Sequence, residues 1–223
     1  MRDEAVLPYV AVIAGAGVGE RMGGPKALLA VRWGDNSGEL PLAIAHARAH
    51  LEGGAGRVVL VTRAEVARVL SRFAQPGLDI VVSTAAADLG PAGTIRTALE
   101  LLDLPDDAWL MIEPVDMPAS SGAIRRELAK GALSTPAPSA VRPLFDGKLG
   151  YPVLVQRNVL GDLLGAQPPS LSEVLTRLAA EGRVADVVVE DKRAITDFDL
   201  PEDVLAFYGE AARFFEEDEP TFA

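Results

Sequence analysis

Short apolar runs alternate with segments of helical periodicity along most of this chain, and this alternation constrains the fold more than any other feature. The runs are mostly aliphatic, as expected of strands that are buried on both faces. We expect strands over residues 10–14, 57–62, 79–83, 108–112, 139–141, 151–155 and 184–190. We expect helices over residues 42–51, 63–73, 95–102, 120–130, 170–181 and 202–216. Repeated strand–helix units predict an α/β protein with a mostly parallel sheet covered by helices.

A length of 223 residues suits one such domain with a sizeable core, so we expect residues 1–223 to form a single domain. Two looser stretches interrupt the pattern. Residues 33–40 predict a surface loop, and the Ser/Pro-rich residues 133–140 are expected to carry the chain across to a second, smaller layer. An acidic tail from about residue 216 is expected to be solvated and frayed.

The first apolar run opens into Gly15-Ala16-Gly17-Val18-Gly19-Glu20-Arg21-Met22-Gly23-Gly24-Pro25-Lys26. Glycines let the backbone approach phosphate oxygens and present N–H groups to them, and Arg21 and Lys26 can neutralise the phosphate charge. The loop is not a P-loop, because no Gly-Lys-Ser/Thr closes it, and Pro25 departs from a dinucleotide fingerprint. Since ligands of open α/β sheets bind beyond the carboxyl ends of the strands, the motif predicts a polyphosphate site there. The alternative is an ordinary glycine-rich turn.

Charge and composition exclude several classes of binding partner and several kinds of site. The net charge of −11 argues against a nucleic-acid-binding protein. The absence of cysteine excludes disulfides and thiolate metal sites and fits a reducing compartment. The N-terminus shows no signal-peptide pattern, and no apolar stretch reaches the roughly 18 residues that span a bilayer. We therefore expect a cytoplasmic protein without a membrane partner.

A candidate metal-binding aspartate follows the apolar run 108–112, in Glu113-Pro114-Val115-Asp116-Met117-Pro118. Asp116 lies at the carboxyl end of an expected strand and is flanked by prolines, which suits a ligand to a divalent cation. Glu113 is a second carboxylate with at most a supporting role. The alternative for Asp116 is a turn or cap before the helix 120–130.

Two further aspartates alternate in Thr196-Asp197-Phe198-Asp199-Leu200. In an extended segment, Asp197 and Asp199 point the same way, and two oxygen ligands on one side suit a hard cation. The residues that follow, Pro201-Glu202-Asp203, predict the start of a helix.

The glycine loop with its Arg-Met-Gly-x-Pro-Lys ending resembles the signature of MobA-like nucleotidyltransferases, and the elements resemble this family in order from residue 10 to about 205. The closest members are similar to molybdenum cofactor cytidylyltransferases and guanylyltransferases. The resemblance implies a three-layer α/β/α fold of the nucleotide-diphospho-sugar transferase type. It also implies a nucleotide site formed by Ala14, Gly15, Ala16, Gly17, Gly19, Arg21, Lys26, Gly90 and Thr94. Gly19 stands where the family often has Ser.

Within this resemblance, Arg21, Lys26 and Asp116 are the catalytic residues. Asp116 would bind Mg²⁺ together with Asp197 or Asp199, of which we rank Asp197 first. Thr94 stands at a family serine in the segment 88–96, although it could instead cap a helix. Ser83-Thr84 does not match the family's usual Asn-Pro.

The segment 145–152 resembles the family's Gly-Arg-x-Gly-His-Pro element, which lines the acceptor side of the pocket. The acceptor-binding residues implied are Lys148, Gly150 and Tyr151, with Lys148 in place of Arg and Tyr151 in place of His. The alternative is a glycine-containing hairpin turn.

The implied reaction joins an NMP group from CTP or GTP to a phosphorylated acceptor, chiefly molybdopterin, and releases pyrophosphate. One alternative is the same reaction on a sugar phosphate or polyol phosphate. Another is a non-catalytic nucleotide-binding or cofactor-handling protein. The sequence leaves the base and the oligomeric state open.

The remaining conspicuous residues are assigned no chemistry. His46 and His50 are spaced i, i+4, but no third ligand accompanies them, so we expect surface residues away from the motif loops. Trp33 and Trp109 are expected to be packing residues.

Overall fold

The computed structural model describes residues 7–34, 38–83 and 89–216. Its main sheet has the strand order β10-β7-β9-β6-β1-β4-β5, with β8 paired to β7. The strands are β1 (Tyr9–Gly15), β4 (Arg57–Thr62), β5 (Leu78–Val82), β6 (Trp109–Pro114), β7 (Ala140–Phe145), β8 (Lys148–Leu149), β9 (Val153–Gln156) and β10 (Val184–Val188). All but β8, for which no strand was expected, overlap an apolar run expected from the sequence.

The sheet is mostly parallel, and one strand on its main path is antiparallel to both of its neighbours. β5, β4, β1 and β6 run in the same direction. β9 is antiparallel to both β6 and β7, and β10 is parallel to β7. The chain builds outward from β1 first through β4 and β5 and then through β6, so the strand order reverses between β1 and β6. A reversal of this kind leaves a crevice at the carboxyl ends of the two strands.

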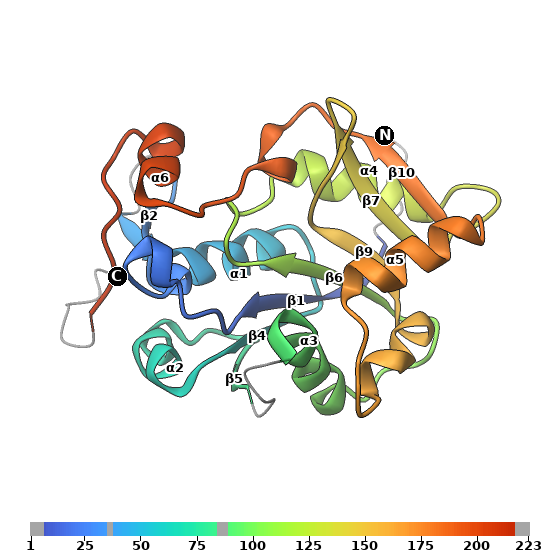
Figure 1. Ribbon diagram of the computed structural model, residues 1–223, viewed down its shortest axis with the longest axis horizontal. Coiled ribbons are helices and arrows are strands. Elements are labelled where there is room, and N and C mark those ends of the chain that lie inside the picture. The colour runs from blue at the N-terminus through green and yellow to red at the C-terminus, as the bar shows by residue number, and fades with distance from the viewer. Residues whose placement is uncertain (1–6, 35–37, 84–88, 217–223) are drawn as a thin grey trace.

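Helices cover both faces of the sheet and give the expected three layers (Figure 1). One face packs against α1 (Leu42–Glu52), α2 (Ala64–Leu70) and α4 (Gly122–Ala132), and α6 (Pro201–Tyr208) adds Val204 to the same core. The other packs against α3 (Gly90–Leu101), the 3₁₀ segment η5 (Arg157–Leu164) and α5 (Leu171–Ala180). The alternation of β1 explains both contacts, because Ala11 and Ile13 belong to the first core and Val12 to the second.

A second, two-stranded sheet pairs β2 (Ala30–Arg32) with β3 (Glu39–Pro41) beside the glycine loop. The segment 212–216, which we call the C-terminal strap, runs along the start of this sheet. The Phe215 amide donates to the Leu28 carbonyl (2.9 Å), and the Ala30 amide donates to the Arg213 carbonyl (2.8 Å). The helix expected over 202–216 is therefore too long: α6 ends at Tyr208, where Gly209 adopts a left-handed conformation, and the strap follows.

Residues 133–140 lead into β7 of the main sheet, so the expectation that they cross to a smaller layer is wrong. The expected loop 33–40 is bordered by β2 and ends in β3, and its residues 35–37 lie outside the described residues. So do the N-terminal residues 1–6, Thr84, Asp88 and the acidic tail beyond residue 216. Trp33 and Trp109 are partly buried against the core, as expected of packing residues.

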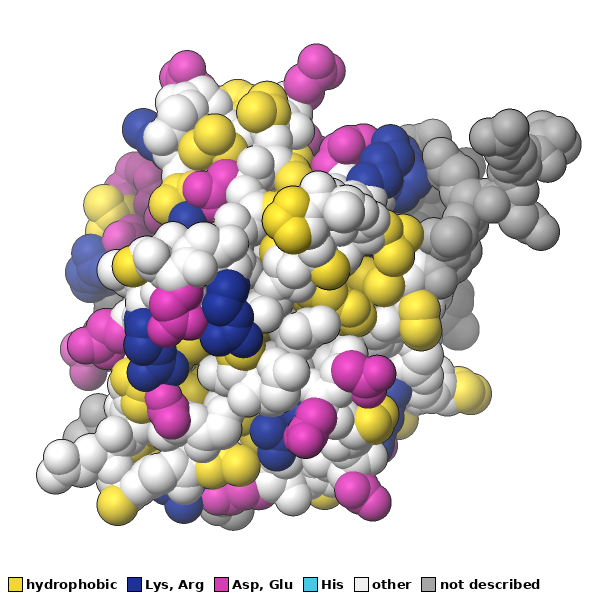
Figure 2. All heavy atoms as spheres, turned by 90° about the vertical axis from the view of Figure 1, so that its right-hand side faces the viewer, with side chains coloured by type: hydrophobic (Ala, Val, Ile, Leu, Met, Phe, Trp, Pro, Cys, Tyr) yellow, Lys and Arg dark blue, Asp and Glu magenta, His cyan; other side chains and the backbone are white. Residues whose placement is uncertain are grey.

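The end of the molecule that carries α5 and β10 shows acidic and basic side chains intermingled (Figure 2). Exposed ion pairs join Arg142 to Asp186 at 2.8 Å and Arg177 to Asp162 at 2.7 Å. Pairs of this kind stabilise the fold only weakly. Within the described residues, no helix combines the length and apolar character that crossing a bilayer requires.

Candidate functional site

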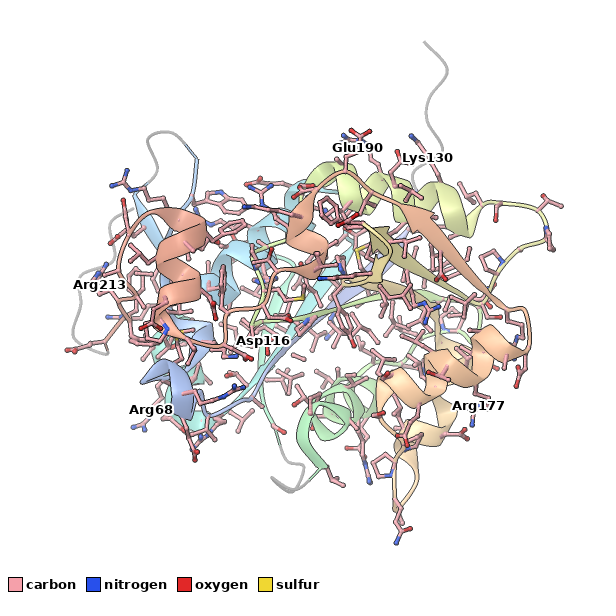
Figure 3. All side chains as sticks on the ribbon, turned by 45° about the horizontal axis from the view of Figure 1, so that its top comes forward. Arg68, Asp116, Lys130, Arg177, Glu190 and Arg213 are labelled. Carbon is pink, nitrogen blue, oxygen red and sulfur yellow. The ribbon has the colours of Figure 1, made fainter. Side chains whose placement is uncertain are left out.

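A cleft of about 810 Å³ opens at the carboxyl ends of β1 and β6, where the strand order reverses. Its lining comes from the glycine loop, from the ends of β4, β5 and β6, from the start of α3 and from the segment before α6. The lining residues are Ala14, Ala16, Gly17, Val18, Gly19, Glu20, Arg21, Lys26, Arg63, Ser83, Gly90, Pro91, Thr94, Pro114, Val115, Asp116 and Asp199. Figure 3 shows Asp116 near the middle of the molecule, whereas Arg177 and Arg213 lie at its periphery.

The glycine loop folds back on itself, and Gly19 makes the fold possible. Gly19 has φ of 71°, and its carbonyl accepts hydrogen bonds from the amides of Met22 (3.0 Å) and Gly24 (3.3 Å). A Cβ atom on Gly19 would lie 2.0 Å from the Gly24 carbonyl oxygen. A serine could not occupy this position without moving the loop, which gives a physical reason for glycine here.

The two cations of the loop meet two carboxylates from distant parts of the chain. Lys26 Nζ lies 3.2 Å from Asp199 Oδ1 and 3.6 Å from Asp116 Oδ2. Arg21 Nη2 lies 3.2 Å from the same oxygen of Asp199. The hydrogen bond and charge of Lys26, together with Arg21, hold the pKa of Asp199 below its usual value. The fold thus brings four of the sequence-predicted site residues into one ion-paired group.

Backbone contacts fix the segment that carries Asp197 and Asp199. Phe198 is fully buried, and its amide donates a 2.7 Å hydrogen bond to the Asp116 carbonyl. Asp203 then accepts from the amides of Asp199 (2.9 Å) and Leu200 (2.8 Å), which starts α6 where the sequence predicts a helix. Burial raises the pKa of Asp197, and the charges of Asp116 and Asp199 raise it further. Asp116 and Asp199 line the cleft, whereas Asp197 lies outside its lining.

The donor set suits a hard divalent cation. Oxygens of Asp116 and Asp199 both lie within ion-pair distance of the Lys26 ammonium, so the two carboxylates accommodate a cation between their segments. Carboxylate oxygens are the ligands that Mg²⁺ prefers. Among the residues that the structure describes, no three His, Cys, Asp or Glu side chains are already gathered as a metal site. Lys26 and Arg21 would have to turn towards other anions before a metal ion could take their place.

The predicted acceptor element forms the hairpin between β7 and β8, so the turn interpretation of this segment is correct for its backbone. Lys148 is exposed, and neither Lys148 nor Gly150 belongs to the cleft lining. A Cβ atom on Gly150 would lie 1.9 Å from the Ala194 carbonyl, and the Tyr151 amide donates to that carbonyl at 2.8 Å. Tyr151 does not belong to the cleft lining either. Burial raises the pKa of Tyr151, and the charges of Asp116 and Asp197 raise it further.

Gly90 and Thr94 both line the cleft, but Thr94 is not a helix cap. α3 begins at Gly90, so Thr94 lies within its first turns, and its hydroxyl donates to the Gly90 carbonyl at 3.4 Å. Gly15 is not among the lining residues: a Cβ atom there would meet Leu60 and the Val61 carbonyl at 3.4 Å, so this glycine serves the packing of β1.

Sequence reasoning missed several lining residues, including Glu20, Arg63 and Ser83. Arg63 directly follows β4 and Ser83 directly follows β5. Both therefore lie at the carboxyl edge that the parallel sheet predicts for ligands. Their place after expected strands was a usable signal, although no motif marks them.

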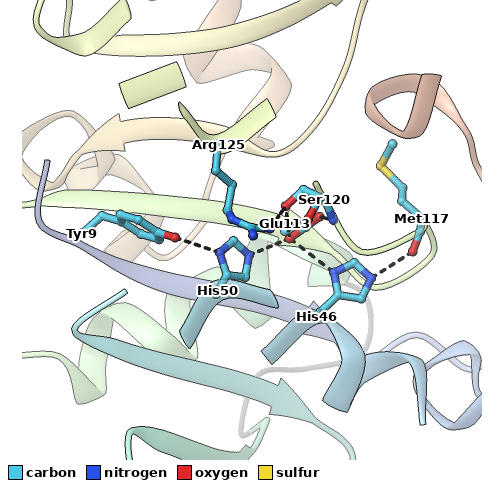
Figure 4. A network of polar contacts seen from close by, with 7 residues as sticks. All are labelled: Tyr9, His46, His50, Glu113, Met117, Ser120 and Arg125. Carbon is cyan, nitrogen blue, oxygen red and sulfur yellow. Dashed lines mark hydrogen bonds and ion pairs between the residues drawn. The ribbon is translucent and has the colours of Figure 1, made fainter. Parts of the chain in front are cut away.

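His46 and His50 are fully buried, and the expectation of surface residues far from the motif loops is wrong. They belong to a polar network under the Asp116 loop (Figure 4). His50 Nε2 lies 2.6 Å from Glu113 Oε2, and His46 Nε2 lies 2.9 Å from the Met117 carbonyl. Glu113 is not among the cleft-lining residues and instead binds His50 and Ser120, so its contacts are structural. The i, i+4 spacing reflects a shared buried face of α1.

The chain was compared with models of known protein families and with curated proteins. The family model described as MobA-like NTP transferase domain matches residues 11–188. In the comparison with curated proteins, no sequence matches the chain.

Several solved structures share the architecture. Rv0371c from Mycobacterium tuberculosis H37Rv superposes with a TM-score of 0.68 at 22% identity, over 92% of this chain and 99% of that one. Its complex with manganese gives a TM-score of 0.63 at 20% identity, over 92% and 100%. A nucleotidyl transferase from Methanothermobacter thermautotroptrophicus gives 0.66 at 19% identity, over 90% and 96%. The 4-diphosphocytidyl-2C-methyl-D-erythritol synthase from Anaerococcus prevotii DSM 20548 gives 0.66 at 13% identity, over 91% and 96%. At these identities the likeness shows the fold, which is that of the nucleotide-diphospho-sugar transferases.

Proposed function

The chain belongs to the MobA-like NTP transferase family and is a nucleotidyltransferase, and from this premise we propose that it transfers an NMP group from CTP or GTP to the phosphate of molybdopterin with Mg²⁺ as cofactor. The observation that carries the proposal is the meeting of Arg21, Lys26, Asp116 and Asp199 in the cleft beside the glycine loop. Phosphate-binding cations and cation-binding carboxylates lie within one ion-paired group, which is the equipment that this reaction needs.

In the proposed reaction, an oxygen of the acceptor phosphate forms a bond to the α-phosphorus of the triphosphate, and the bond from that phosphorus to the bridging oxygen of pyrophosphate breaks. Arg21 and Lys26 hold the leaving pyrophosphate and share the negative charge that grows on it. The glycine loop keeps the triphosphate in line for attack, so the protein contributes mainly position and charge. No side-chain nucleophile is required.

The metal would be held by Asp116 with Asp199 or Asp197, whose segments are already joined by the Phe198–Asp116 hydrogen bond. When bound, Mg²⁺ supplies neutralisation of the α-phosphate and pyrophosphate oxygens. Binding of the triphosphate draws Lys26 and Arg21 away from Asp199, so the carboxylate oxygens become available to a cation. The manganese complex of Rv0371c supports a divalent ion in a protein of this fold.

Tyr151 bears on which acceptor the enzyme uses. Tyr151 stands where related cytidylyltransferases and guanylyltransferases carry His, and the charges of Asp116 and Asp197 contribute to raising the pKa of its hydroxyl. A second candidate acceptor is a polyol phosphate, because the Anaerococcus neighbour is a diphosphocytidyl-methylerythritol synthase. A tyrosine can hydrogen-bond to either acceptor.

The test is pyrophosphate release with Mg²⁺ or Mn²⁺, each of the four nucleoside triphosphates, and either molybdopterin with and without molybdate or a panel of sugar and polyol phosphates. Asp116→Ala serves as the inactive control. Release with CTP or GTP and molybdopterin, lost in the control, supports the proposal. Release of pyrophosphate only with a polyol or sugar phosphate identifies that compound, and not molybdopterin, as the acceptor. Triphosphate binding without release from any acceptor overturns the proposed reaction.

A further inference from the structure

The loop that carries Asp116 is closed at its base by a buried side chain. Glu113 precedes this loop, and Ser120 follows it, just before α4. Glu113 Oε1 accepts a 2.8 Å hydrogen bond from the Ser120 amide, and Oε2 lies 3.2 Å from the Ser120 hydroxyl. Arg125 donates to the Ser120 carbonyl and lies 3.1 Å from its hydroxyl. One carboxylate therefore joins the two ends of residues 114–119 from inside the protein.

The two peptide groups that flank the Cα atom of Met117, directly after Asp116, are held by donors from other parts of the fold. The Phe198 amide binds the Asp116 carbonyl at 2.7 Å. His46 Nε2 lies 2.9 Å from the Met117 carbonyl, and since a carbonyl only accepts, this nitrogen carries the proton. By contrast, the Asp116 side chain is 43% exposed, so its own packing does not set its direction. The orientation of its carboxylate follows from the backbone that these contacts hold.

His46 also lies beside the base of the loop. Its Nδ1 is 3.3 Å from Glu113 Oε2, a contact that is an ion pair when the ring carries both protons, and both residues are buried (Figure 4). On the far side of the network, His50 binds the same carboxylate oxygen at 2.6 Å, and the Tyr9 hydroxyl lies 3.4 Å from His50 Nδ1. Buried polar groups of this kind specify one arrangement, because a displaced member leaves unpaired atoms in a low-dielectric interior.

We propose that His46 and Glu113 are positioning residues that hold the Asp116 loop in the geometry needed for the metal. The inference rests on the proposed function for the role of Asp116 and adds residues that touch neither nucleotide nor metal. Partners that orient a metal ligand affect metal affinity by roughly 10- to 100-fold when removed. The triphosphate site on the glycine loop is separate and should be spared.

The experiment compares His46→Ala, His46→Gln and Tyr9→Phe with the wild-type chain. Glutamine places an amide N–H near the position of the imidazole Nε2–H, so it can restore the bond to Met117, whereas alanine cannot. Tyr9→Phe removes a polar atom at the far end of the same network without touching the loop, and it is the matched control. Mn²⁺ affinity is measured by electron paramagnetic resonance with a triphosphate and no acceptor, and kcat and KM are measured in the transfer assay. Thermal unfolding identifies variants that do not fold.

We expect His46→Ala to weaken Mn²⁺ binding about 10-fold or more and to lower kcat, with KM for the triphosphate changed less than about two-fold. We expect His46→Gln to recover most of both losses and Tyr9→Phe to behave as wild type. A folded His46→Ala chain with wild-type Mn²⁺ affinity and kcat overturns the inference. So does a Tyr9→Phe chain with the same defect as His46→Ala, because the effect would then come from the core in general.

The measurements distinguish failure of the proposed transfer reaction from failure of the proposed positioning role. If no triphosphate and acceptor pair releases pyrophosphate, but Mn²⁺ affinity falls in His46→Ala and returns in His46→Gln, the positioning role stands and the proposed reaction does not. If wild type turns over and Mn²⁺ affinity is the same in all variants, the reaction stands and the positioning role does not. Should His46→Ala fail to fold, Glu113→Gln, which keeps the shape and loses the charge, is expected to weaken Mn²⁺ binding in its place, and unchanged binding in that variant overturns the inference.

Discussion

The backbone amide of Phe198 donates a 2.7 Å hydrogen bond to the carbonyl oxygen of Asp116, and this contact joins the two segments that bring carboxylates to the cleft. Phe198 is fully buried and packs against Phe207 and Tyr208 of α6, with ring centroids 5.7 and 5.6 Å away. An apolar anchor therefore sets where Asp197 and Asp199 stand relative to Asp116. The carboxylates themselves remain partly exposed and free to exchange partners.

Asp116→Asn is expected to abolish transfer while leaving the triphosphate site intact. The substitution removes a charge but keeps the size of the side chain, and the glycine loop, Arg21 and Lys26 are unchanged. We expect kcat to fall by roughly 100-fold or more, as for other losses of charge stabilisation in an active site. Triphosphate affinity without metal should change only a few-fold. Steady-state kinetics and isothermal titration calorimetry give the two numbers, and near-normal kcat would remove Asp116 from the catalytic residues.

Asp199→Asn is expected to strengthen triphosphate binding in metal-free buffer. Asp199 is the shared counter-anion of Arg21 and Lys26, so a triphosphate must displace it. An exposed ion pair is worth up to about 1 kcal/mol, so the gain should be about five-fold. Asp186→Asn, which breaks the exposed pair with Arg142 elsewhere on the surface, is the control and should have no effect. Weaker metal-free binding in Asp199→Asn would contradict the competition.

Gly19→Ala is expected to damage the glycine loop, whereas Gly17→Ala is not. Gly19 has a left-handed backbone and a Cβ atom there would strike the Gly24 carbonyl, while a Cβ atom on Gly17 meets nothing within 4 Å. A left-handed conformation alone costs a non-glycine residue about 1–2 kcal/mol. We expect that loss or more in the free energy of unfolding of Gly19→Ala, and a change within about 0.5 kcal/mol for Gly17→Ala. Urea unfolding of both chains measures the difference; equal stabilities would show that the loop adapts.

The buried network predicts that stability falls in mild acid. Burial lowers the pKa of His50, and this outweighs the opposing effect of its hydrogen bond to Glu113. Below about pH 6.5 the unfolded chain therefore binds a proton that the folded chain does not, so the free energy of unfolding falls as pH falls. By pH 5 this one group can account for at most about 2 kcal/mol. His50→Gln removes the group, and its stability should depend less steeply on pH between 7 and 5 in urea titrations.

Glu113 extends the same trend to lower pH. Burial raises the pKa of Glu113, but the charges and hydrogen bonds of His46 and His50 lower it more, so its pKa lies well below its usual range. Its contribution to stability is present above about pH 4.3, the value for the unfolded chain, and is lost progressively as the pH falls below that. Glu113→Gln should therefore flatten the dependence below pH 4.3. Because Glu113 opposes the lowering of the His50 pKa, the dependence between pH 7 and 5 should become no shallower than in wild type. The opposite pattern would mean that another group governs each range.

Much of the architecture could be predicted because buried parallel strands are short aliphatic runs and because strand ends share one edge of the sheet. The expected strand over residues 57–62 has the observed bounds of β4. The meeting of Arg21, Lys26 and Asp116 follows from that edge, since the two loops that carry them continue the neighbouring strands β1 and β6. The position of Asp199 followed only from family resemblance.

Most of the features that could not be predicted from the sequence depend on contacts between residues far apart in the chain. The reversal of β9 depends on pairing with β6 and β7, which no local pattern encodes. α3 begins at Gly90 although Gly and Pro favour loops, because Pro91 is tolerated in the first turn of a helix. The role of His46 and His50 depends on Glu113, more than 60 residues away along the chain. Without that partner, a pair of histidines on a helix is uninformative.

The C-terminal strap has a consequence for how the molecule is made. Its Phe215 binds the Leu28 carbonyl, and the ring of Phe214 lies where a Cβ atom on Gly24 would touch it at 3.1 Å. A ribosome produces the glycine loop with the first strand but produces Asp199 and the strap only much later, and chains fold from the N-terminus as they emerge. The cleft is thus completed last although its first loop is made early. Until the strap has been made, the glycine loop lacks the segment that packs against Gly24 and hydrogen-bonds to Leu28.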